Sequence, residues 1–269
     1  QEFLASLPNY LNLYEALGLE SPIMATVPHI FNEQGNKKLS KRDGAKDVLD
    51  YLGEGYLAEA LVSFIATLGW NDGTEQEVFK VDELVKKFSL GRVQRSGARF
   101  DEHRLQWVNG HFIRQLPINE LYERAKDYWP AEAKDYDDTY QKVVLGLVQE
   151  RLKHLSELPE LTTFFFVDLP VDPTLISKHK QLSPLDKSEL RHLLEQAKAT
   201  LQQSDFSLED LTERLNKLLE ATNQKPAVLF SLIRIATTQA AASPSLAATL
   251  AVLSKDVSLR RIDAQLSGL

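Results

Sequence analysis

Residues 26–45 read TVPHIFNEQGNKKLSKRDGA, and their local pattern differs from that of the rest of the chain. Residues 26–31 and 37–39 are short runs that suit strands, and Gly35 lies in the polar segment that separates them. Short runs of this kind around a glycine-bearing turn are typical of a small β-hairpin. The stretch therefore predicts two short strands that present a basic loop, residues 37–46, at the exit of the hairpin.

This loop is strongly basic in an acidic chain. Five basic residues and one acidic residue, Asp43, give it a local charge of about +4, whereas the whole chain has a formal net charge of −7. Ammonium groups that a loop brings to a phosphate stabilise the negative charge that develops there in a transition state. Lys38 and Lys41 are candidate charge donors and Ser40 is a candidate for ordering the loop. The alternative is a solvated basic turn.

Most of the remaining chain carries apolar residues at spacings of three and four, which is the pattern of packed amphipathic helices. In the first half we expect helices over residues 8–17, 57–68, 81–88 and 101–108. Asp82 is a candidate cap, and Asn109-Gly110 is expected to close the last of these helices. Later helices are expected to start at Pro117, Ser183-Pro184, Ser207 with Asp210, Pro226 and Ser243-Pro244. The chain is therefore predicted to be mainly α.

The chain is long enough for more than one core. With 269 residues and 43% hydrophobic content, it can bury one large core or two smaller ones. Candidate boundaries near Leu116 and Ser183 divide it into three expected parts, residues 1–115, 116–182 and 183–269. The apolar run Phe164-Phe165-Phe166-Val167 is predicted to pack in a core rather than to bind a ligand.

Composition excludes several classes of protein and of site. The chain has no cysteine, which excludes disulfides and cysteine-bound zinc, and its six histidines have no metal-ligand spacing. No run reaches the roughly 18 apolar residues of a membrane span, and no signal pattern is present. We expect a cytoplasmic protein with no metal site and no membrane partner. Because the chain starts at Gln1 without an initiator methionine, we also expect it to be part of a longer protein.

A second basic cluster lies between residues 86 and 104. Asp101 and Glu102 are its only acidic members, so its net charge is about +4. Such groups neutralise phosphates and give salt-dependent affinity for nucleic acid, whereas the alternative is an ordinary charged face. Trp107 follows with the spacing of a core residue, so helix packing competes with stacking on a ribose or a base. The basic members are Lys86, Lys87, Arg92, Arg95, Arg99 and Arg104.

Several motifs, in a fixed order, resemble the class I aminoacyl-tRNA synthetases and specifically the glutamyl-tRNA synthetases. These motifs are KKLSKRDGA at 37–45, LGW at 68–70, SGARFD at 96–101 and LQWVNGHFI at 105–113. The first resembles the KMSKS loop of that family. The resemblance implies that residues 1–115 form a helical stem-contact domain that carries this loop and the small hairpin.

The same resemblance implies roles for individual residues. It implies catalytic roles for Lys38, Ser40 and Lys41, contacts to ATP from Lys38, Leu39 and Lys41, and contacts to tRNA from Arg42, Arg95, Arg99, Trp107 and Asn109. The family's histidine-containing HIGH motif is absent, and no glycine-rich phosphate loop follows a strand. We therefore expect ATP with Mg²⁺, and glutamate, to bind in the intact enzyme through a domain that this chain lacks. The chain alone is expected to be inactive and to hold no cofactor.

The second half resembles the all-helical anticodon-binding domain of the same family, in two sub-domains. The matching segments are VQERLK at 148–153, residues 226–236, and SPSL at 243–246. Unpaired bases are recognised by edge hydrogen bonds and by stacking, and helix N-termini attract phosphates. Where the family usually has a threonine-glycine pair, this chain has residues 237–240, TTQA. The candidate anticodon contacts are Arg151, Arg234, Ser243, Pro244 and Leu246, and the alternative for Arg234 is an ion pair with a carboxylate.

The helical character of this half favours glutamyl- over glutaminyl-tRNA synthetases of the eukaryotic type, which carry β-barrel anticodon domains. No run of alternating strands follows Pro117. The expected partner is tRNA(Glu), and the sequence leaves open whether tRNA(Gln) is accepted as well. We expect a monomer. The rival hypothesis is a helical interaction or scaffold protein without a catalytic role, which the acidic charge and abundant helix would also fit.

Overall fold

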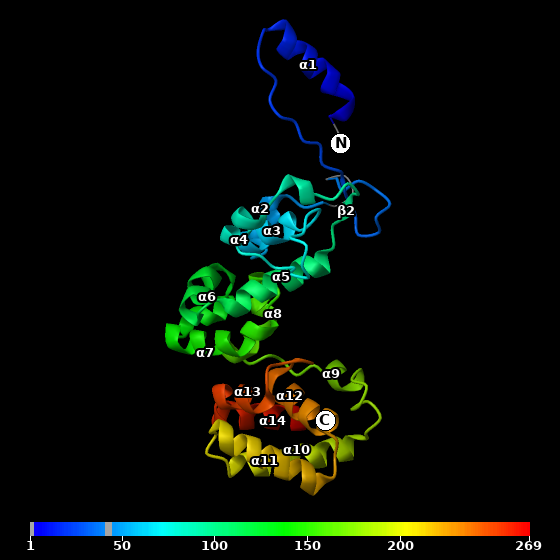
Figure 1. The fold of residues 1–269 in the computed structure, drawn as a ribbon. Helices are drawn as coiled ribbons and strands as arrows, with labels where there is room; N and C mark the ends of the chain where they lie inside the picture. Colours follow the sequence, from blue (N-terminus) through cyan, green and yellow to red (C-terminus); the bar gives the residue numbers. More distant parts are fainter. Residues whose placement is uncertain (1–2, 41–44) are drawn as a thin grey trace. The chain divides into compact units, whose positions relative to one another are not determined.

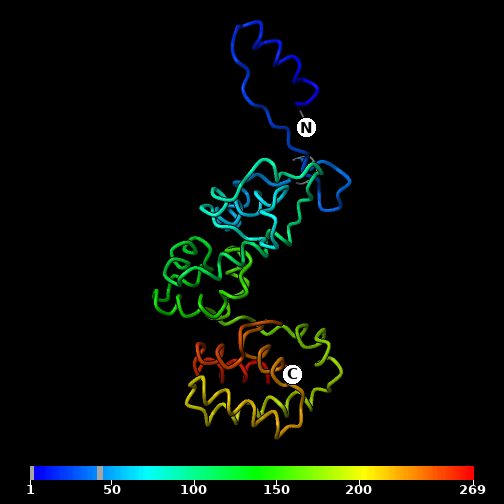
Figure 2. The backbone as a smooth tube through the Cα atoms, viewed as in Figure 1, coloured from blue at the N-terminus to red at the C-terminus, as the bar shows by residue number. Residues whose placement is uncertain are grey.

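The computed structural model describes residues 3–40 and 45–269. The chain forms two compact units, residues 1–116 with 153–155, and residues 117–152 with 156–269. Figures 1 and 2 show that the regular structure of both units is almost entirely helical. The prediction of a mainly α protein is confirmed.

The first unit combines five α-helices with two short strands in its described part. Its elements are α1 (Leu7–Ala16), β1 (Ile30–Phe31), α2 (Val48–Gly53), α3 (Ala58–Ala66), α4 (Val81–Lys87), β2 (Ala98–Arg99) and α5 (Glu102–Gln115), with 3-10 turns at Leu4–Ser6 and Leu90–Arg92. Aspartates cap two of the helices: Asp47 accepts from the Leu49 N–H, and Asp101 accepts from the Arg104 N–H. Asp82, the expected cap of α4, lies in its first turn instead, because Lys80 is the N-cap residue.

The predicted hairpin is present as a turn, but its main strand partner is different. The Asn32 N–H donates to Lys37 O and the Leu39 N–H donates to Ile30 O, both across 2.9 Å. In addition, β1 pairs in parallel with β2, with Phe31 opposite Arg99. The hairpin pattern could not predict this second pairing, because β2 lies far along the chain and has only two residues.

Helix α5 is longer than the sequence predicts. We expected it to end at Asn109-Gly110, yet it continues to Gln115 and buries Phe112 and Ile113. The Asn109 side chain does not close the helix, because it bonds elsewhere in the unit. Its Oδ1 accepts from the Leu57 N–H at 2.8 Å, and its Nδ2 donates to Lys153 O at 2.5 Å. Asn109 therefore ties α5 to the start of α3 and to residues 153–155.

The second unit contains nine α-helices in its described part. They are α6 (Ile118–Ala125), α7 (Asp138–Val148), α8 (Leu158–Phe166), α9 (Thr174–Ser177), α10 (Lys187–Gln202), α11 (Leu208–Thr222), α12 (Pro226–Thr238), α13 (Leu246–Leu253) and α14 (Lys255–Gly268). Short 3-10 turns lie at Lys126–Tyr128, Ala131–Asp135 and Gln149–Arg151, and another covers Leu155–Glu157.

The buried residues of this unit include two hydrophobic clusters. The smaller core joins Val144 of α7 and Phe164–Phe166 of α8 to Leu253 at the end of α13, and it confirms the prediction that the phenylalanine run packs in a core. The larger core is built mainly from leucine and isoleucine side chains of α10, α11, α12, α13 and α14. In Figure 1, α10 and α11 lie side by side with α12, α13 and α14 packed against them.

Two predicted helix starts are wrong by a few residues. Helix α10 starts at Lys187 rather than at Ser183-Pro184, because Asp186 and Glu189 form a reciprocal capping box. Helix α13 starts at Leu246 rather than at Ser243-Pro244, because the Ser243 hydroxyl is used in a tertiary contact. The start at Pro226 is as predicted.

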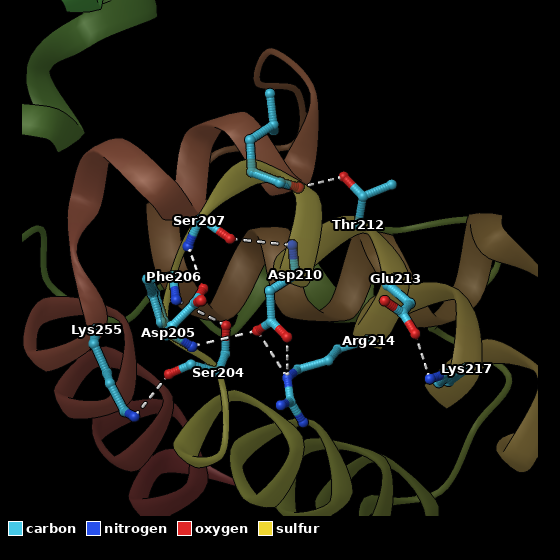
Figure 3. Close-up of polar contacts among 11 residues, drawn as sticks. Ser204, Asp205, Phe206, Ser207, Asp210, Thr212, Glu213, Arg214, Lys217 and Lys255 are labelled. Atoms are coloured by element: carbon cyan, nitrogen blue, oxygen red, sulfur yellow. Dashed lines mark hydrogen bonds and ion pairs between the residues drawn. The ribbon is translucent and has the colours of Figure 1, made fainter.

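The turn between α10 and α11 is fixed by a polar network (Figure 3). Ser207 accepts from the Asp210 N–H, as predicted. The Asp210 carboxylate, however, accepts from the Asp205 N–H and from Arg214 Nε instead of completing a capping box. Phe206 has a φ of 63° in this turn, and its N–H donates to Ser204 Oγ. Lys255 of α14 donates to Ser204 O at 2.9 Å, which attaches the turn to the last helix.

Within the described residues, the helices are all too short or too polar to cross a lipid bilayer.

Candidate functional site

Two arginines of the second unit form a cationic pair. Arg234 lies in α12 and is about half-buried, and Arg151 ends the exposed 3-10 turn Gln149–Arg151. Burial lowers the pKa of Arg234, and the nearby positive charge of Arg151 lowers it further. Across the described part of the chain neither guanidinium has a carboxylate within ion-pair distance. The pair is therefore a site of uncompensated positive charge, which suits an anion or the electronegative edge of a base.

Arg234 is held by a hydroxyl group rather than by a carboxylate. Its Nε donates to Ser243 Oγ at 2.9 Å, and Ser243 in turn donates to Pro244 O at 3.2 Å. Thr249 of α13 donates to the same Ser243 oxygen at 3.5 Å. The alternative in which Arg234 forms an ion pair is thus wrong for the described residues, and the planar guanidinium group keeps donors for a ligand.

The side chains of Ser243, Pro244 and Leu246 are buried, and the Ser243 hydroxyl accepts a hydrogen bond from Arg234. Ser243 is 2% exposed and Leu246 is 5% exposed, and Pro244 is also buried. Contacts of these three residues with an anticodon remain a prediction, and little of their side chains is exposed to a ligand. Thr249 had not been singled out, because a threonine inside an apolar helix gives no sequence signal.

The described part of the basic loop lies next to the two-stranded sheet of the first unit. Lys38 is exposed and forms an antiparallel bridge with Phe31. Leu39 and Ser40 are half-buried, and Ser40 O accepts from the Ala45 N–H at 3.1 Å. Lys41 and Arg42, the other two predicted site residues of the loop, lie outside the described residues.

Lys46, at the end of the basic loop, is bound to carboxylates of its own unit. Its Nζ donates to Glu54 Oε2 at 2.9 Å and to Glu102 Oε1 at 3.0 Å, and it lies 5.3 Å from the centroid of the Tyr51 ring. Burial acts to lower the pKa of Lys46, but the bonds to Glu54 and Glu102 outweigh it and raise that pKa. Lys46 therefore anchors the loop to the start of α5 and does not add a free charge to it.

The second basic cluster is divided between internal contacts and exposed positions. Lys87 pairs with Asp72 at 2.7 Å and Arg104 pairs with Glu77 at 3.3 Å. Arg95 is exposed. Arg99 is also exposed, and its guanidinium group lies against Gly35, where a Cβ would meet Arg99 Nε at 2.5 Å. The cluster thus offers fewer free cations than its sequence suggests.

Trp107 and Asn109 lie close together on α5 but differ completely in exposure. Trp107 is 50% exposed, with its ring centroid 6.1 Å from that of His111, so the interpretation of Trp107 as a core residue is wrong. Asn109 is fully buried with its amide bonded on both sides. The contact of Asn109 with tRNA remains a prediction, and of the two side chains only that of Trp107 is exposed.

Comparisons with known proteins match both parts of the chain. The anticodon binding domain family matches residues 120–266, and the catalytic domain family of class I tRNA synthetases (E and Q) matches residues 1–107. Glutamate–tRNA ligase 2 of Caldicellulosiruptor saccharolyticus is 33% identical over 98% of this chain and 54% of its own length. The glutamate–tRNA ligase of Clostridium novyi is 36% identical over 97% of this chain and 54% of its own length.

Solved structures share the fold. A glutamate tRNA ligase from Elizabethkingia meningosepticum, in complex with its amino acid, has a TM-score of 0.79 at 24% identity, over 100% of this chain and 56% of that chain. The glutamate-tRNA synthetase of Elizabethkingia anophelis has a TM-score of 0.77 at 24% identity, over 99% of this chain and 55% of its own. The chain spans about half the length of the curated relatives it matches. It belongs to the bacterial glutamyl-tRNA synthetases, and it corresponds to the end of their catalytic domain together with their anticodon-binding domain.

Proposed function

We propose that this chain is the tRNA-binding part of an enzyme that ligates glutamate to tRNA(Glu) with ATP. The observation that carries the proposal is Arg234, a half-buried guanidinium group whose pKa the positive charge of Arg151 helps to lower, and which, like Arg151, has no carboxylate partner in the described structure. A buried or half-buried arginine normally has an acidic partner, because uncompensated charge is unfavourable in a protein. A partner supplied by bound RNA accounts for the lack of one in the protein.

The pair supports recognition of unpaired bases rather than of a duplex. The Arg234 side chain is fixed by Ser243, and a fixed, planar guanidinium group can hydrogen-bond the edge of a base that has left its stack. Arg151 is exposed beside it and can contact a phosphate. We propose that these two residues bind the anticodon loop, and that Arg95, Arg99 and the exposed face of Trp107 contact the tRNA stem.

The binding test uses the 269-residue chain, labelled tRNA(Glu) and filter binding at two salt concentrations. Arg234→Gln and Arg151→Gln are each expected to weaken binding about tenfold, the effect of losing a good base contact or phosphate contact. Arg191→Gln is the matched control, because Arg191 is exposed on α10 and its substitution removes the same charge. Equal loss in all three variants would mean that only net charge matters, and it would contradict a specific site at the pair.

The basic loop is proposed to serve the chemical step. Lys38 and Lys41, ordered by Ser40, would stabilise the charge that develops on the α-phosphate of ATP when glutamyl-adenylate forms. Leu39 would lie against the nucleotide, and Arg42 against tRNA. ATP with Mg²⁺ and glutamate would be held mainly by residues of the intact enzyme beyond this chain. The chain by itself is therefore expected to give no ATP–pyrophosphate exchange with glutamate.

The loop assignment is tested in an intact enzyme that contains this chain. Lys38→Ala and Lys41→Ala are expected to lower the rate of pyrophosphate exchange and to leave the Kd for tRNA nearly unchanged, because their charge acts in the transition state. Arg234→Gln is expected to do the opposite. Equal effects of both kinds of variant on both quantities would contradict this division of roles.

The rival function, a helical scaffold without a catalytic role, makes a different prediction. A scaffold would be indifferent to tRNA at both salt concentrations, whereas binding through phosphates weakens as salt rises. We further propose that the protein works in the cytoplasm as a monomer. Whether it also accepts tRNA(Gln) is tested by comparing tRNA(Gln) with tRNA(Glu) in the same binding assay.

A further inference from the structure

A groove of about 580 Å³ lies in the second unit, and neither Arg151 nor Arg234 lines it. It lies between the start of α7 and the end of α8 on one side and the junction of α13 and α14 on the other. Phe165, Phe166, Val252 and Leu253 line its apolar part. Its volume falls in the range of sites that hold small ligands, roughly 300–1,000 Å³. The side chains that give it chemical character are Tyr136, Tyr140, Asp168, Arg260 and Arg261.

One wall of the groove is a fixed aromatic surface. The rings of Tyr136 and Tyr140 are stacked, with centroids 5.0 Å apart, and Phe166 meets Tyr136 edge to face at 5.2 Å. The Tyr136 hydroxyl donates to Phe166 O at 3.0 Å and the Tyr140 hydroxyl donates to Phe165 O at 3.1 Å. Burial raises the pKa of Tyr140 to about 12, so its hydroxyl stays protonated at neutral pH. Tyr136 is 38% exposed, which leaves part of its ring open to a ligand.

The other side of the groove carries two arginines, which differ in how many of their N–H donors are used within the protein. Arg261 donates to Asp168 Oδ1, Thr237 O and Val167 O at 2.8, 2.7 and 2.9 Å, so it serves the fold. Arg260 donates once, to Asp168 Oδ2 at 2.6 Å, and its side chain is 60% exposed. Asp168 compensates only one of the two charges. Arg260 is therefore oriented by Asp168 and keeps further N–H donors for an anion.

We propose that this groove binds a nucleotide, with its base stacked on Tyr136 and its phosphate at Arg260. A flat aromatic ring accepts any base face, and an oriented guanidinium group bonds a phosphate through two parallel N–H groups. The ligand can be a free nucleotide or one nucleotide of a bound RNA strand. Helix α13 runs from the arginine site to the groove. Its first residue, Leu246, comes shortly after Ser243, which bonds Arg234, and its last residue, Leu253, lines the groove. Eight residues of helix span about 12 Å, a distance that a strand of a few nucleotides covers.

The first arm of the test is calorimetric titration of the 269-residue chain with AMP, with adenosine and with ribose 5-phosphate. Tyr136→Leu removes the ring and Arg260→Gln removes the charge, and each is expected to weaken AMP binding at least about fivefold, in line with the loss of one stacked base. Tyr136→Phe keeps the ring, and Arg191→Gln removes an exposed arginine outside the groove. Both controls are expected to bind AMP like the unchanged chain. Adenosine has no phosphate, so its affinity should not change in Arg260→Gln. Ribose 5-phosphate has no base, so its affinity should not change in Tyr136→Leu.

The second arm repeats the four variants with tRNA(Glu) in the filter-binding assay. Weakened AMP binding in Tyr136→Leu and Arg260→Gln assigns the groove to a free nucleotide, and weakened tRNA binding assigns it to an RNA strand. If neither ligand responds to these two variants, the proposal is overturned. The RNA arm rests on the proposed function, and Arg234→Gln separates the two failures. A loss of tRNA binding in Arg234→Gln, together with no effect in the groove variants, rejects the groove and leaves the anticodon site intact.

Discussion

Arg234 donates a hydrogen bond from Nε to the Oγ of Ser243 across 2.9 Å, and Ser243 is buried, with only 2% of the residue exposed. The contact fixes a cationic side chain of α12 against the segment that leads into α13. It turns a serine that the sequence marks as a helix start into a support for the candidate ligand-binding arginine. The direction of the Arg234 side chain therefore depends on Ser243.

Ser243→Ala is expected to weaken tRNA(Glu) binding by about threefold to tenfold, because Arg234 loses its fixed orientation while keeping its charge. The free energy of unfolding should fall by about 1 kcal/mol, the typical net value of one hydrogen bond. Filter binding and urea denaturation measure the two effects. In an Arg234→Gln background, Ser243→Ala should have little further effect on binding, and full additivity of the two changes would show that Ser243 acts independently of Arg234.

Asn109→Ala is expected to destabilise the first unit by about 3 kcal/mol, because it leaves the Leu57 N–H and Lys153 O without their buried partner. Trp107→Ala, two residues earlier on the same helix, should lower the free energy of unfolding by less, about 1–2 kcal/mol, since half of Trp107 is exposed. Thermal and urea unfolding measure both. A large loss of stability in Trp107→Ala would contradict the exposed position, and would remove Trp107 as a candidate for tRNA contact.

Gly97→Ala is expected to disrupt the pairing of β1 with β2. A Cβ at residue 97 would lie 2.1 Å from Phe31 Cε2 and 2.7 Å from His29 O, and the second atom belongs to the backbone and cannot rotate away. Overpacking of this kind costs about 1–3 kcal/mol. Hydrogen exchange should report faster exchange of the Phe100 N–H, which donates to Phe31 O.

Gly69→Ala is the matched control for this substitution, because a Cβ at residue 69 would meet no atom within 4 Å. It should leave the exchange rate of the Phe100 N–H unchanged. Equal exchange rates of the Phe100 N–H in the Gly97 and Gly69 variants would mean that β1 can shift and still keep its pairing with β2. Gly97 would then not be required for the strand contact.

The Asp168 carboxylate is expected to give a pH-dependent contribution to stability. Its hydrogen bond from Arg261 lowers its pKa, burial opposes this, and Arg260 lowers the pKa further. Because the folded pKa lies below the unfolded value of about 3.9, the contribution is complete above that value and is lost as pH falls through the folded pKa. Half of the side chain is exposed, so the effect should be about 1 kcal/mol or less.

Asp168→Asn tests this contribution by urea denaturation without ligand at pH 7 and near pH 2.5. The variant should be less stable than the unchanged chain at pH 7, and the difference should shrink at low pH, where the aspartate is protonated as well. A difference that stays constant over this range would assign the loss to geometry rather than to charge.

Much of the fold could be predicted from the sequence because its signals are local. Spacings of three and four apolar residues gave the helical class, and Pro226 correctly marked the start of α12. The ends of helices were harder to predict, since several capping signals compete over a few residues. Helix α10 begins after the capping box of Asp186 and Glu189 rather than at Ser183-Pro184. At α5 the Asn109-Gly110 pair did not end the helix, because the Asn109 amide bonds to distant backbone groups.

The candidate site was predicted only in part. Motif resemblance identified Arg151, Arg234 and Ser243 as a group, but it could not tell a side chain that faces a ligand from one that supports it from below. Exposure decides that difference, and exposure depends on how α12 and α13 pack. The same reason explains why Trp107 was expected in a core and was found on the surface, and why the groove beside Tyr136 and Arg260 had no sequence signal.

By itself the sequence determined the helical class, the excess positive charge of residues 37–46, and the order of motifs that places the chain among glutamyl-tRNA synthetases, because each depends on residues that are neighbours in the chain. The tertiary structure alone decided which charges remain available. Lys46, Lys87, Arg104 and Arg261 form ion pairs with carboxylates of their own unit, whereas Arg151 and Arg234 form none with any residue that the structure describes. Ion pairing needs two groups within a few ångströms, and only packing brings together groups from distant parts of a chain.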